Sequence, residues 1–148
     1  MANVNLQIVR ERASEIRESV EKIRRYVSLS DEEFWADERN LYTVMHLLLI
    51  AIEATAALCN HILARTAHRA PISYAECFES LREVHGMDDE LTARLVRMAR
   101  FRNLLVHRYW EVQPERVLQY ARENLDDFKA YLQAVEKMID VSGLSSSK

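Results

Sequence analysis

The chain is 148 residues long, which suits one domain whose core is large enough to be stable without metal ions or disulfide bonds. Hydrophobic residues make up 49% and charged residues 29%, and there are only two glycines and two prolines. Because glycine and proline are the residues that end helices, their scarcity favours long helices. The formal net charge of −3 argues against a protein that coats nucleic acid non-specifically, but it allows a local basic site.

The most apolar segment, residues 41–59, is interrupted by His46 and Glu53. A membrane span needs about 20 largely uninterrupted apolar residues, so we predict a buried core helix here. The N-terminus has no apolar stretch of the signal-peptide kind. Cys59 and Cys77 lack C-x-x-C spacing, and we predict that both are reduced thiols in a cytoplasmic protein.

The first half of the chain predicts two long helices. Over residues 4–28 apolar side chains recur at spacings of three and four, which forms one stripe down a helix. In the break that follows, Ser30 and Glu33 have the spacing of a capping box. A second helix is predicted over residues 37–65, and it is apolar on nearly every side. We therefore expect this second helix at the centre of the fold.

The second half begins with a short helix. Ser73 and Glu76 form another capping-box pattern, which opens a helix that runs through Val84. His85 and Gly86 are predicted to end it, because glycine adopts the left-handed conformation at low cost.

Two further long helices complete the prediction. Asp88 is expected to cap a fourth helix, and Pro114, a favoured first-turn residue, to open a fifth that ends near Asp140. The expected architecture is all-α, an up-and-down bundle of four long helices plus one short helix. It is expected to occupy residues 1–141, with a frayed tail over residues 142–148.

Polar side chains interrupt the fourth helix in its last turns, within the segment RFRNLLVHRYW, residues 100–110. Arg102 falls on the line of apolar residues that runs down this helix to Tyr109. Because a buried guanidinium is costly unless it is paired, Arg102 needs a carboxylate partner, an anion or a wet cleft. Asn103 and His107 lie four residues apart, so they are neighbours on an adjacent face.

Arg102 and His107 point in different directions, by about 140° on an ideal helix of 3.6 residues per turn. One helix therefore cannot easily aim both at the same atom, unless its end unwinds or a second copy contributes. Residues 91–110 also hold five arginines and no acidic residue, so a phosphate is expected to bind here. The arginines are Arg94, Arg97, Arg100, Arg102 and Arg108.

The pattern Arg102-Asn103-x-x-x-His107-x-Tyr109 resembles the Arg-x4-His-x-Tyr motif of HEPN domains. In particular, it resembles HepT-type toxins that are paired with a MntA-type nucleotidyltransferase antitoxin. The resemblance covers most of the chain, including the segments AIEATAALCNHI, RAPISYAECFESL and VQPERV. There are two departures: Gln113 stands where an acidic residue often precedes the last helix, and the basic run before Arg102 is richer than the motif requires.

The resemblance implies a metal-independent endoribonuclease without a cofactor. Cleavage through the RNA 2′-hydroxyl needs a base, an acid and positive charge on the phosphorane-like transition state. His107 is able to act as base or acid, and Arg102 to bind phosphate oxygens in a fork. Asn103 is expected to orient His107 or to touch the phosphate. Because one motif supplies a single histidine, we expect a two-fold homodimer with a shared cleft.

The resemblance also implies partners. The antitoxin is expected to transfer AMP onto Tyr109, which would block substrate sterically and compete for Arg102. The substrate is expected to be RNA, with transfer RNA favoured and messenger RNA left open. Arg97, Arg100 and Arg108 are the expected additional phosphate contacts. No membrane is expected as a partner. No metal ion is expected to bind, because no recognised metal-ligand spacing is present.

Structural roles compete with these functional ones. Arg102 paired with Glu53 is a structural alternative, and Glu53 would also suit a supporting role for an active-site arginine. His107 alone would fit a helix C-terminus favoured by the dipole, and Trp110 is interpreted as a core aromatic. One set on the second helix, spaced every seven residues, is interpreted as a buried polar network: His46, Glu53 and Asn60.

Two other functions stay open at this point. One is a non-catalytic HEPN module that binds nucleotide or scaffolds a nucleotidyltransferase. The other is a plain helical interaction protein in which the motif packs the core. His107→Ala separates the first from a ribonuclease, because it should abolish RNA cleavage only in the enzyme. Arg102→Ala should mainly lower thermal stability in the interaction protein.

Overall fold

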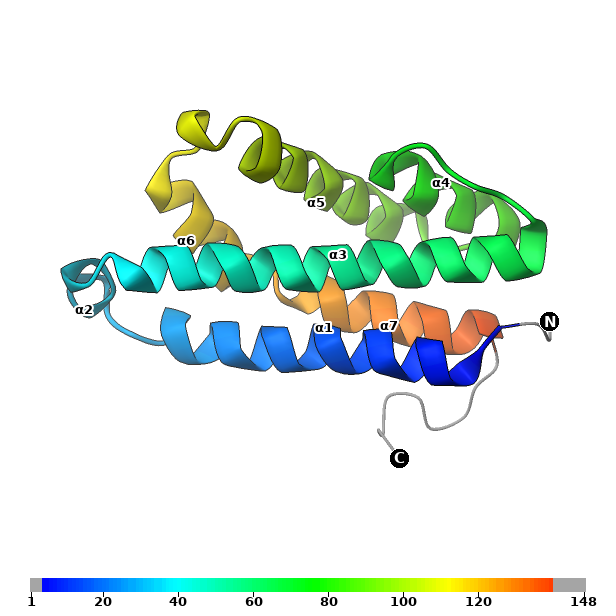
Figure 1. The fold of residues 1–148 in the computed structure, drawn as a ribbon, viewed down its shortest axis with the longest axis horizontal. Helices are drawn as coiled ribbons and strands as arrows, with labels where there is room; N and C mark the ends of the chain where they lie inside the picture. The colour runs from blue at the N-terminus through cyan, green and yellow to red at the C-terminus, as the bar shows by residue number, and fades with distance from the viewer. Residues whose placement is uncertain (1–3, 140–148) are drawn as a thin grey trace.

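The computed structural model describes residues 4–139, and all regular structure in that range is helical (Figure 1). The predicted all-α bundle is confirmed. The predicted tail and the domain limit at residue 141 lie outside the described residues. In chain order the elements are α1 (Leu6–Val27), α2 (Asp31–Ala36), α3 (Arg39–Ala67), α4 (Tyr74–His85), α5 (Asp89–His107), the 3-10 turn η1 (Tyr109–Glu111), α6 (Pro114–Glu123) and α7 (Asp126–Ile139).

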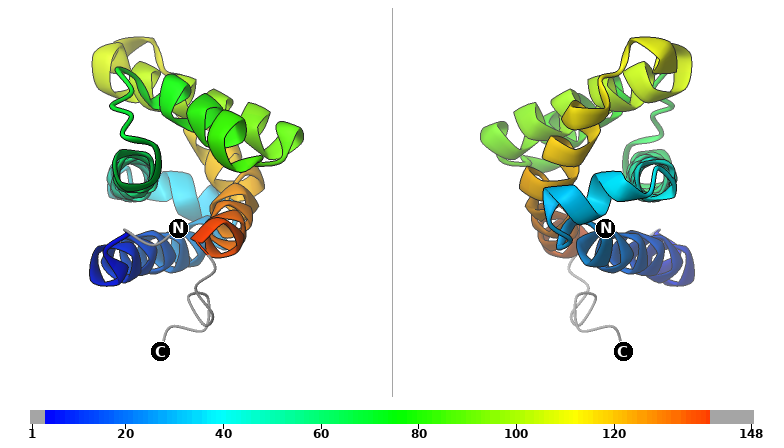
Figure 2. Two further views of the ribbon diagram at one scale, coloured as in Figure 1. Left: turned by 90° about the vertical axis from the view of Figure 1, so that its right-hand side faces the viewer. Right: turned by 90° about the vertical axis from the view of Figure 1, so that its left-hand side faces the viewer.

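Helix α3 is the central element, as its composition predicts. It packs against α1 along its length and against α4, α5 and α6 on other sides. The end-on views of Figure 2 show α1, α3, α5 and α7 around a common core, with α4 lying beside α5. Deep in that core the hydroxyl of Tyr131 on α7 donates to the backbone carbonyl of Thr55 on α3 at 2.9 Å. Helix α3 passes the length and hydropathy test for a membrane span, but 61% of its most apolar window is buried inside the bundle.

The helix boundaries follow from local capping chemistry. Ser30 and Glu33 form a complete capping box at α2, in which each side chain bonds the other residue's backbone N–H. The Ser73 side chain accepts from the backbone N–H of Glu76 at the start of α4. Gly86 ends α4 with φ 72°, in the left-handed region where a side chain would be strained. Both predicted boundaries of α4 are therefore confirmed.

The predicted fifth helix is divided into two helices in the structure. A single helix was expected from Pro114 to Asp140, whereas the described part divides into α6 and α7 around Asn124 and Leu125. Asn124 has φ −117° and ψ 6°, outside the helical region, although its N–H still reaches the carbonyl of Tyr120. The bend lets α6 pack on α1 and α3 while α7 packs on α1 and α5. The spacing of apolar residues in the sequence does not reveal such a bend, because both halves keep an apolar face.

The short helix α2 is a further addition to the predicted elements.

The prediction of two reduced cysteines is wrong for this structure. Cys59 on α3 and Cys77 on α4 form a disulfide, with their Cα atoms 6.4 Å apart. That separation lies within the usual range for disulfides. The sequence spacing of 18 residues did not reveal the pair, because the loop between α3 and α4 decides which turns meet. Disulfides are rare in the cytosol, so a cytoplasmic location stays a prediction.

Candidate active site

The candidate site lies where helix α5 ends. Its last helical residue is His107, and the N–H of Arg108 still bonds the carbonyl of Leu104 at 3.0 Å. Arg108 then adopts φ −140° and ψ 40°, which turns the chain out of the helix into η1. Tyr109 therefore leaves the helical line on which the sequence placed it, and its side chain is 64% exposed.

Trp110 corrects another expectation. It was interpreted as a core aromatic, but it is 68% exposed and meets Tyr109 edge-to-face, with ring centroids 5.4 Å apart. The reason is the same end of α5: beyond His107 the chain no longer follows the face that packs inward. The two aromatic side chains project from the bundle beside the last turn of α5.

Arg102 is held by a carboxylate from another helix. Its Nε and Nη2 atoms lie 3.0 and 2.9 Å from Oε2 of Glu53 on α3. The Arg102 side chain is 20% exposed and that of Glu53 is 44% exposed, so the ion pair sits at the edge of the core. The pairing considered as a structural alternative is therefore present. It also places Glu53 where a supporting residue for Arg102 would have to lie.

Tyr74 completes this arrangement, and sequence reasoning did not identify it. Its hydroxyl donates to the other carboxylate oxygen of Glu53, Oε1. Its ring lies against Arg102, with the guanidinium carbon 4.6 Å from the ring centroid, in a cation–π arrangement. Burial, followed by the hydrogen bond to Glu53 and the charge of that carboxylate, raises the pKa of Tyr74 above its usual value. No spacing or motif in the sequence marks Tyr74 for this role.

Asn103 connects the Arg102 pair to the other face of α5. Its side-chain oxygen accepts from Nη1 of Arg102 at 3.2 Å. On its far side lies a shallow hollow of about 470 Å³, which Asn103 lines with Leu104 and three basic residues. The basic residues are Arg100, His107 and Arg108. Arg102 is not among the residues that line this hollow, in agreement with the divergence expected from helical geometry.

The remaining arginines of the basic segment have different surroundings. Arg94 pairs with Glu90 at 2.9 Å and with Asp127 at 2.9 Å, so its charge is balanced. Arg97 lies toward α6 and α7, where its charge acts on the ionisation of Tyr120 and Asp127. Of the three predicted additional phosphate contacts, the structure brings Arg100 and Arg108 to the hollow of His107. It does not bring Arg97 there.

The expected polar network on α3 is wrong. His46 and Asn60 are exposed, and only Glu53 is half-buried. A second hollow, of about 540 Å³, runs between α1 and α3, and Glu53 reaches it too. Its lining residues are Arg12, Glu15, His46, Leu49, Ile50, Glu53, Ala54 and Ala57. Glu53 is therefore shared between the Arg102 pair and this hollow.

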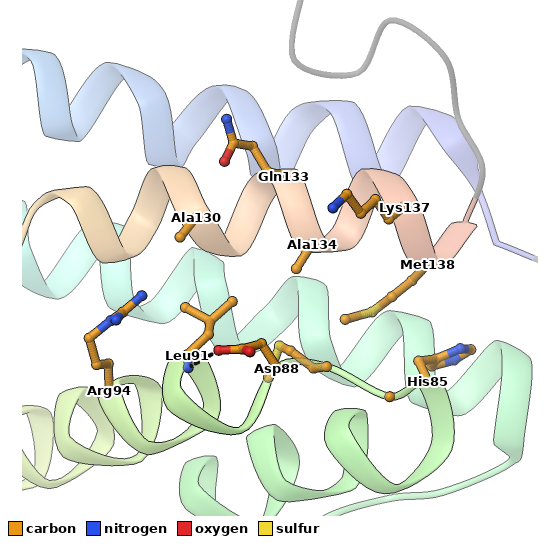
Figure 3. A pocket seen from close by; sticks show the side chains of 11 residues that line it. His85, Asp88, Leu91, Arg94, Ala130, Gln133, Ala134, Lys137 and Met138 are labelled. Atoms are coloured by element: carbon orange, nitrogen blue, oxygen red, sulfur yellow. Dashed lines mark hydrogen bonds between the residues drawn. The ribbon is translucent and has the colours of Figure 1, made fainter.

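A third cavity, also of about 540 Å³, lies at the opposite end of α5 (Figure 3). Leu91, Arg94 and Lys137 are among the side chains around it, and none of the predicted site residues lines it. Across residues 4–139, no group of three or more His, Cys, Asp or Glu side chains is placed to hold a metal ion. The residues with chemistry for phosphate and proton transfer therefore gather at the C-terminal end of α5.

The sequence profile of a family described as Ribonuclease HepT-like matches residues 16–135 of the chain. One relative, a tRNA nuclease HepT from Aphanizomenon flos-aquae, is 19% identical over 139 residues. The match covers 94% of this chain and 95% of that protein.

Solved structures share the fold. The tri-AMPylated HEPN toxin of Shewanella oneidensis, solved in complex with MNT antitoxin, superposes with a TM-score of 0.80 at 22% identity. That match covers 88% of this chain and 97% of the toxin chain. YutE of Bacillus subtilis, described as a cytosolic protein of unknown function, has a TM-score of 0.79 at 14% identity, covering 95% and 94% of the two chains. At these identities the similarity establishes the arrangement of helices alone.

Proposed function

The chain belongs to the HepT-like ribonuclease family, and from that premise we propose that it is the toxin of a toxin–antitoxin pair that cleaves RNA without a metal ion. The observation that carries the proposal is the chain of contacts at the end of α5. Arg102 is oriented by Glu53, Asn103 bonds Arg102, and Asn103 also lines the basic hollow of His107. Asn103 thus links the phosphate-binding and proton-transfer groups, which lie on different faces of α5.

The proposed reaction is attack by the RNA 2′-hydroxyl oxygen on the adjacent phosphorus, which expels the 5′-oxygen and leaves a 2′,3′-cyclic phosphate. A base takes the 2′-hydroxyl proton and an acid protonates the leaving oxygen. His107 is suited to either step because an imidazole ring can accept a proton at one nitrogen and donate one from the other. Arg102 would stabilise the charge that develops on the phosphate oxygens.

A homodimer would supply the second proton-transfer group. His107 is exposed, and Arg102 does not line its hollow, so one copy presents the two functions on different faces. A two-fold axis that brings two such ends together would place Arg102 of one copy near His107 of the other. Arg100 and Arg108 would then extend the basic surface along the RNA backbone. Transfer RNA is the proposed substrate, in line with the name of the relative from Aphanizomenon flos-aquae.

The proposed control is AMP transfer by a MntA-type nucleotidyltransferase onto Tyr109. The phenol oxygen would attack the α-phosphorus of ATP, losing its proton and releasing pyrophosphate. Tyr109 is exposed beside the hollow of His107, so a transferase would reach it in the folded protein. Incubation with the cognate transferase and ATP should add AMP to the wild type, and mass spectrometry should find none on Tyr109→Phe. An unmodified Tyr109 in the wild type would refute this control.

One experiment tests the activity. Purified wild type, Arg102→Ala and His107→Ala would be incubated with labelled total tRNA in EDTA, with folding matched by circular dichroism. Arg10→Ala serves as the matched control, because Arg10 is an exposed arginine on α1. Cleavage by wild type and Arg10→Ala alone, leaving 2′,3′-cyclic phosphate ends, supports the proposal. Equal activity in all four proteins would reveal a contaminating nuclease and remove its support.

A second candidate function is a non-catalytic module that binds nucleotide or scaffolds the transferase. One observation favours it: Arg102 already donates one hydrogen bond to Glu53 and one to Asn103, and its Nη2 is ion-paired with Glu53 at 2.9 Å. A guanidinium so engaged has fewer donors for a phosphate. If wild type cleaves neither tRNA nor mRNA while still binding the transferase, this second function takes precedence.

A further inference from the structure

The carboxylate of Glu53 accepts hydrogen bonds from side chains of two different helices. Its Oε2 accepts a hydrogen bond from Nε of Arg102 on α5 and lies 2.9 Å from Nη2 of the same group in an ion pair. Its Oε1 accepts from the hydroxyl of Tyr74 on α4. A carboxylate with one fixed oxygen cannot rotate freely about its terminal torsion. The second oxygen therefore offers Arg102 a partner at a defined place. The Tyr74 hydroxyl thus acts on Arg102 through Glu53.

The ring of Tyr74 acts on Arg102 directly. The guanidinium carbon lies 4.6 Å from the ring centroid, so one face of the planar group is covered by an aromatic surface. Guanidinium groups stack favourably on such faces. The side-chain oxygen of Asn103 adds a third contact, at Nη1. In-plane and out-of-plane movements of Arg102 are therefore restrained by separate groups.

Helix α4 is itself fixed in place close to Tyr74. Cys77, one turn further along α4, is bonded to Cys59 on α3, the helix that carries Glu53. The first turn of α4 is also capped by the Ser73 side chain. Tyr74 is consequently the first residue of an element that is anchored covalently to the helix of its hydrogen-bond partner.

We propose that Tyr74 is a positioning residue for the RNA phosphate site: its hydroxyl fixes Glu53 and its ring fixes the plane of Arg102, so that the guanidinium is oriented before substrate arrives. This inference rests on the proposed function, in which Arg102 contacts the phosphate. The two parts of Tyr74 act separately, which makes them separable by substitution. Tyr74→Phe removes the hydroxyl and keeps the ring, whereas Tyr74→Leu removes both.

Misplacing a group that contacts the transition state costs rate even when the group itself is retained, by about a hundredfold for a displacement near 1 Å. We expect Tyr74→Phe to lower kcat by about tenfold and Tyr74→Leu by about a hundredfold, with KM changed far less than kcat. In an Arg102→Lys background, where no fork remains to be oriented, the same two substitutions should have at most a twofold effect.

The experiment combines steady-state RNA cleavage with NMR of the Arg102 side chain. In ¹⁵N-labelled protein the Nε–H signal of Arg102 is identified by its loss in Arg102→Lys. Its exchange with solvent should be slow in the wild type and at least tenfold faster in Tyr74→Phe. Tyr26→Phe and Tyr26→Leu are the matched controls, because Tyr26 is a half-buried tyrosine that packs on the core from α1. They should change neither the signal nor kcat.

The outcomes separate this inference from the proposed function. Unchanged exchange and unchanged kcat in Tyr74→Phe overturn the positioning role, even if the wild type cleaves RNA efficiently. Effects of equal size in the wild-type and Arg102→Lys backgrounds also overturn it, because Tyr74 would then act independently of the guanidinium. If exchange is faster in Tyr74→Phe than in the wild type but the wild type never cleaves RNA, the positioning of Arg102 is supported and the proposed ribonuclease is refuted.

Discussion

The two faces of the last turns of α5 contrast in how much of their geometry the fold determines. On one face Arg102 is mostly buried and contacted by groups from α3 and α4. On the other, His107 is exposed, and Tyr109 and Trp110 project beyond the helix. The group suited to binding charge is thus fixed within one chain. The groups suited to proton transfer and modification are left open to other molecules.

The largest effect should come from the open face. His107→Ala should lower RNA cleavage by about a hundred- to ten-thousandfold, the usual contribution of general acid–base catalysis. The melting temperature should stay unchanged, because the side chain is exposed and contributes no packing. Cleavage assays and thermal denaturation on the same preparations check both points. A lower melting temperature together with unchanged RNA cleavage would show that His107 contributes to stability and not to catalysis, the opposite of what is expected for this face.

The fixed face should respond strongly in stability instead. Replacing both cysteines, Cys59→Ser with Cys77→Ser, opens a loop of 18 residues and should lower the free energy of unfolding by about 3 kcal/mol. Urea denaturation of the double variant measures this loss. Oxidised and reduced wild type should differ by a similar amount. Identical denaturation midpoints in the two redox states would show that the α3–α4 link contributes nothing to stability.

A smaller loss is expected when the ion pair is broken. Glu53→Ala leaves Arg102 near the core without its carboxylate, and should cost about 1–2 kcal/mol, between the values for exposed and buried pairs. Glu111→Ala is the control, because Glu111 faces Arg108 at 3.7 Å in an exposed pair and should cost almost nothing. Chemical denaturation compares the two variants. Equal losses of unfolding free energy in the two variants would mean that the partly buried ion pair of Glu53 contributes no more stability than the exposed pair of Glu111.

The smallest effect concerns pH and lies away from both faces. Burial lowers the pKa of His61 and of His85 below the ordinary value of 6.5, and the charge of Arg65 adds to the effect at His61. The folded state therefore favours the neutral rings, so their contribution is present above about pH 6.5 and is lost as pH falls below it. The melting temperature should decline across that range, and less so in the double variant His61→Gln, His85→Gln. An unchanged slope in the double variant would assign the decline to other groups.

Most of this fold, and the pairing of Arg102, could be predicted from the sequence because they depend on local patterns. Caps located the helix boundaries at Ser73 and Gly86, and the capping-box spacing of Ser30 was recognised although the short helix that it opens was not predicted. The interruption of an apolar stripe by Arg102 predicted a partner, and Glu53 was named for that role. These features depend on neighbours in the chain or on helical periodicity, which a sequence contains.

The features missed depend on how separate helices meet. Tyr74 reaches the site because α4 folds back over α3 and α5, and no local pattern encodes that approach. The Cys59–Cys77 bond has the same origin. Trp110 was misplaced because the prediction followed the helical line as far as Tyr109, whereas α5 ends at His107 and the chain beyond it leaves the face that packs inward. Errors of this kind concentrate at helix ends and crossings.

Glu53 belongs to two surfaces at once, since it holds Arg102 and also lines the hollow between α1 and α3. Any molecule that settles in that hollow and draws on this carboxylate would weaken its hold on the guanidinium. Thermodynamic linkage makes such an effect mutual: a phosphate captured by Arg102 would alter the affinity of the hollow by the same factor. A single glutamate would thereby couple binding in the α1–α3 hollow to phosphate binding at Arg102.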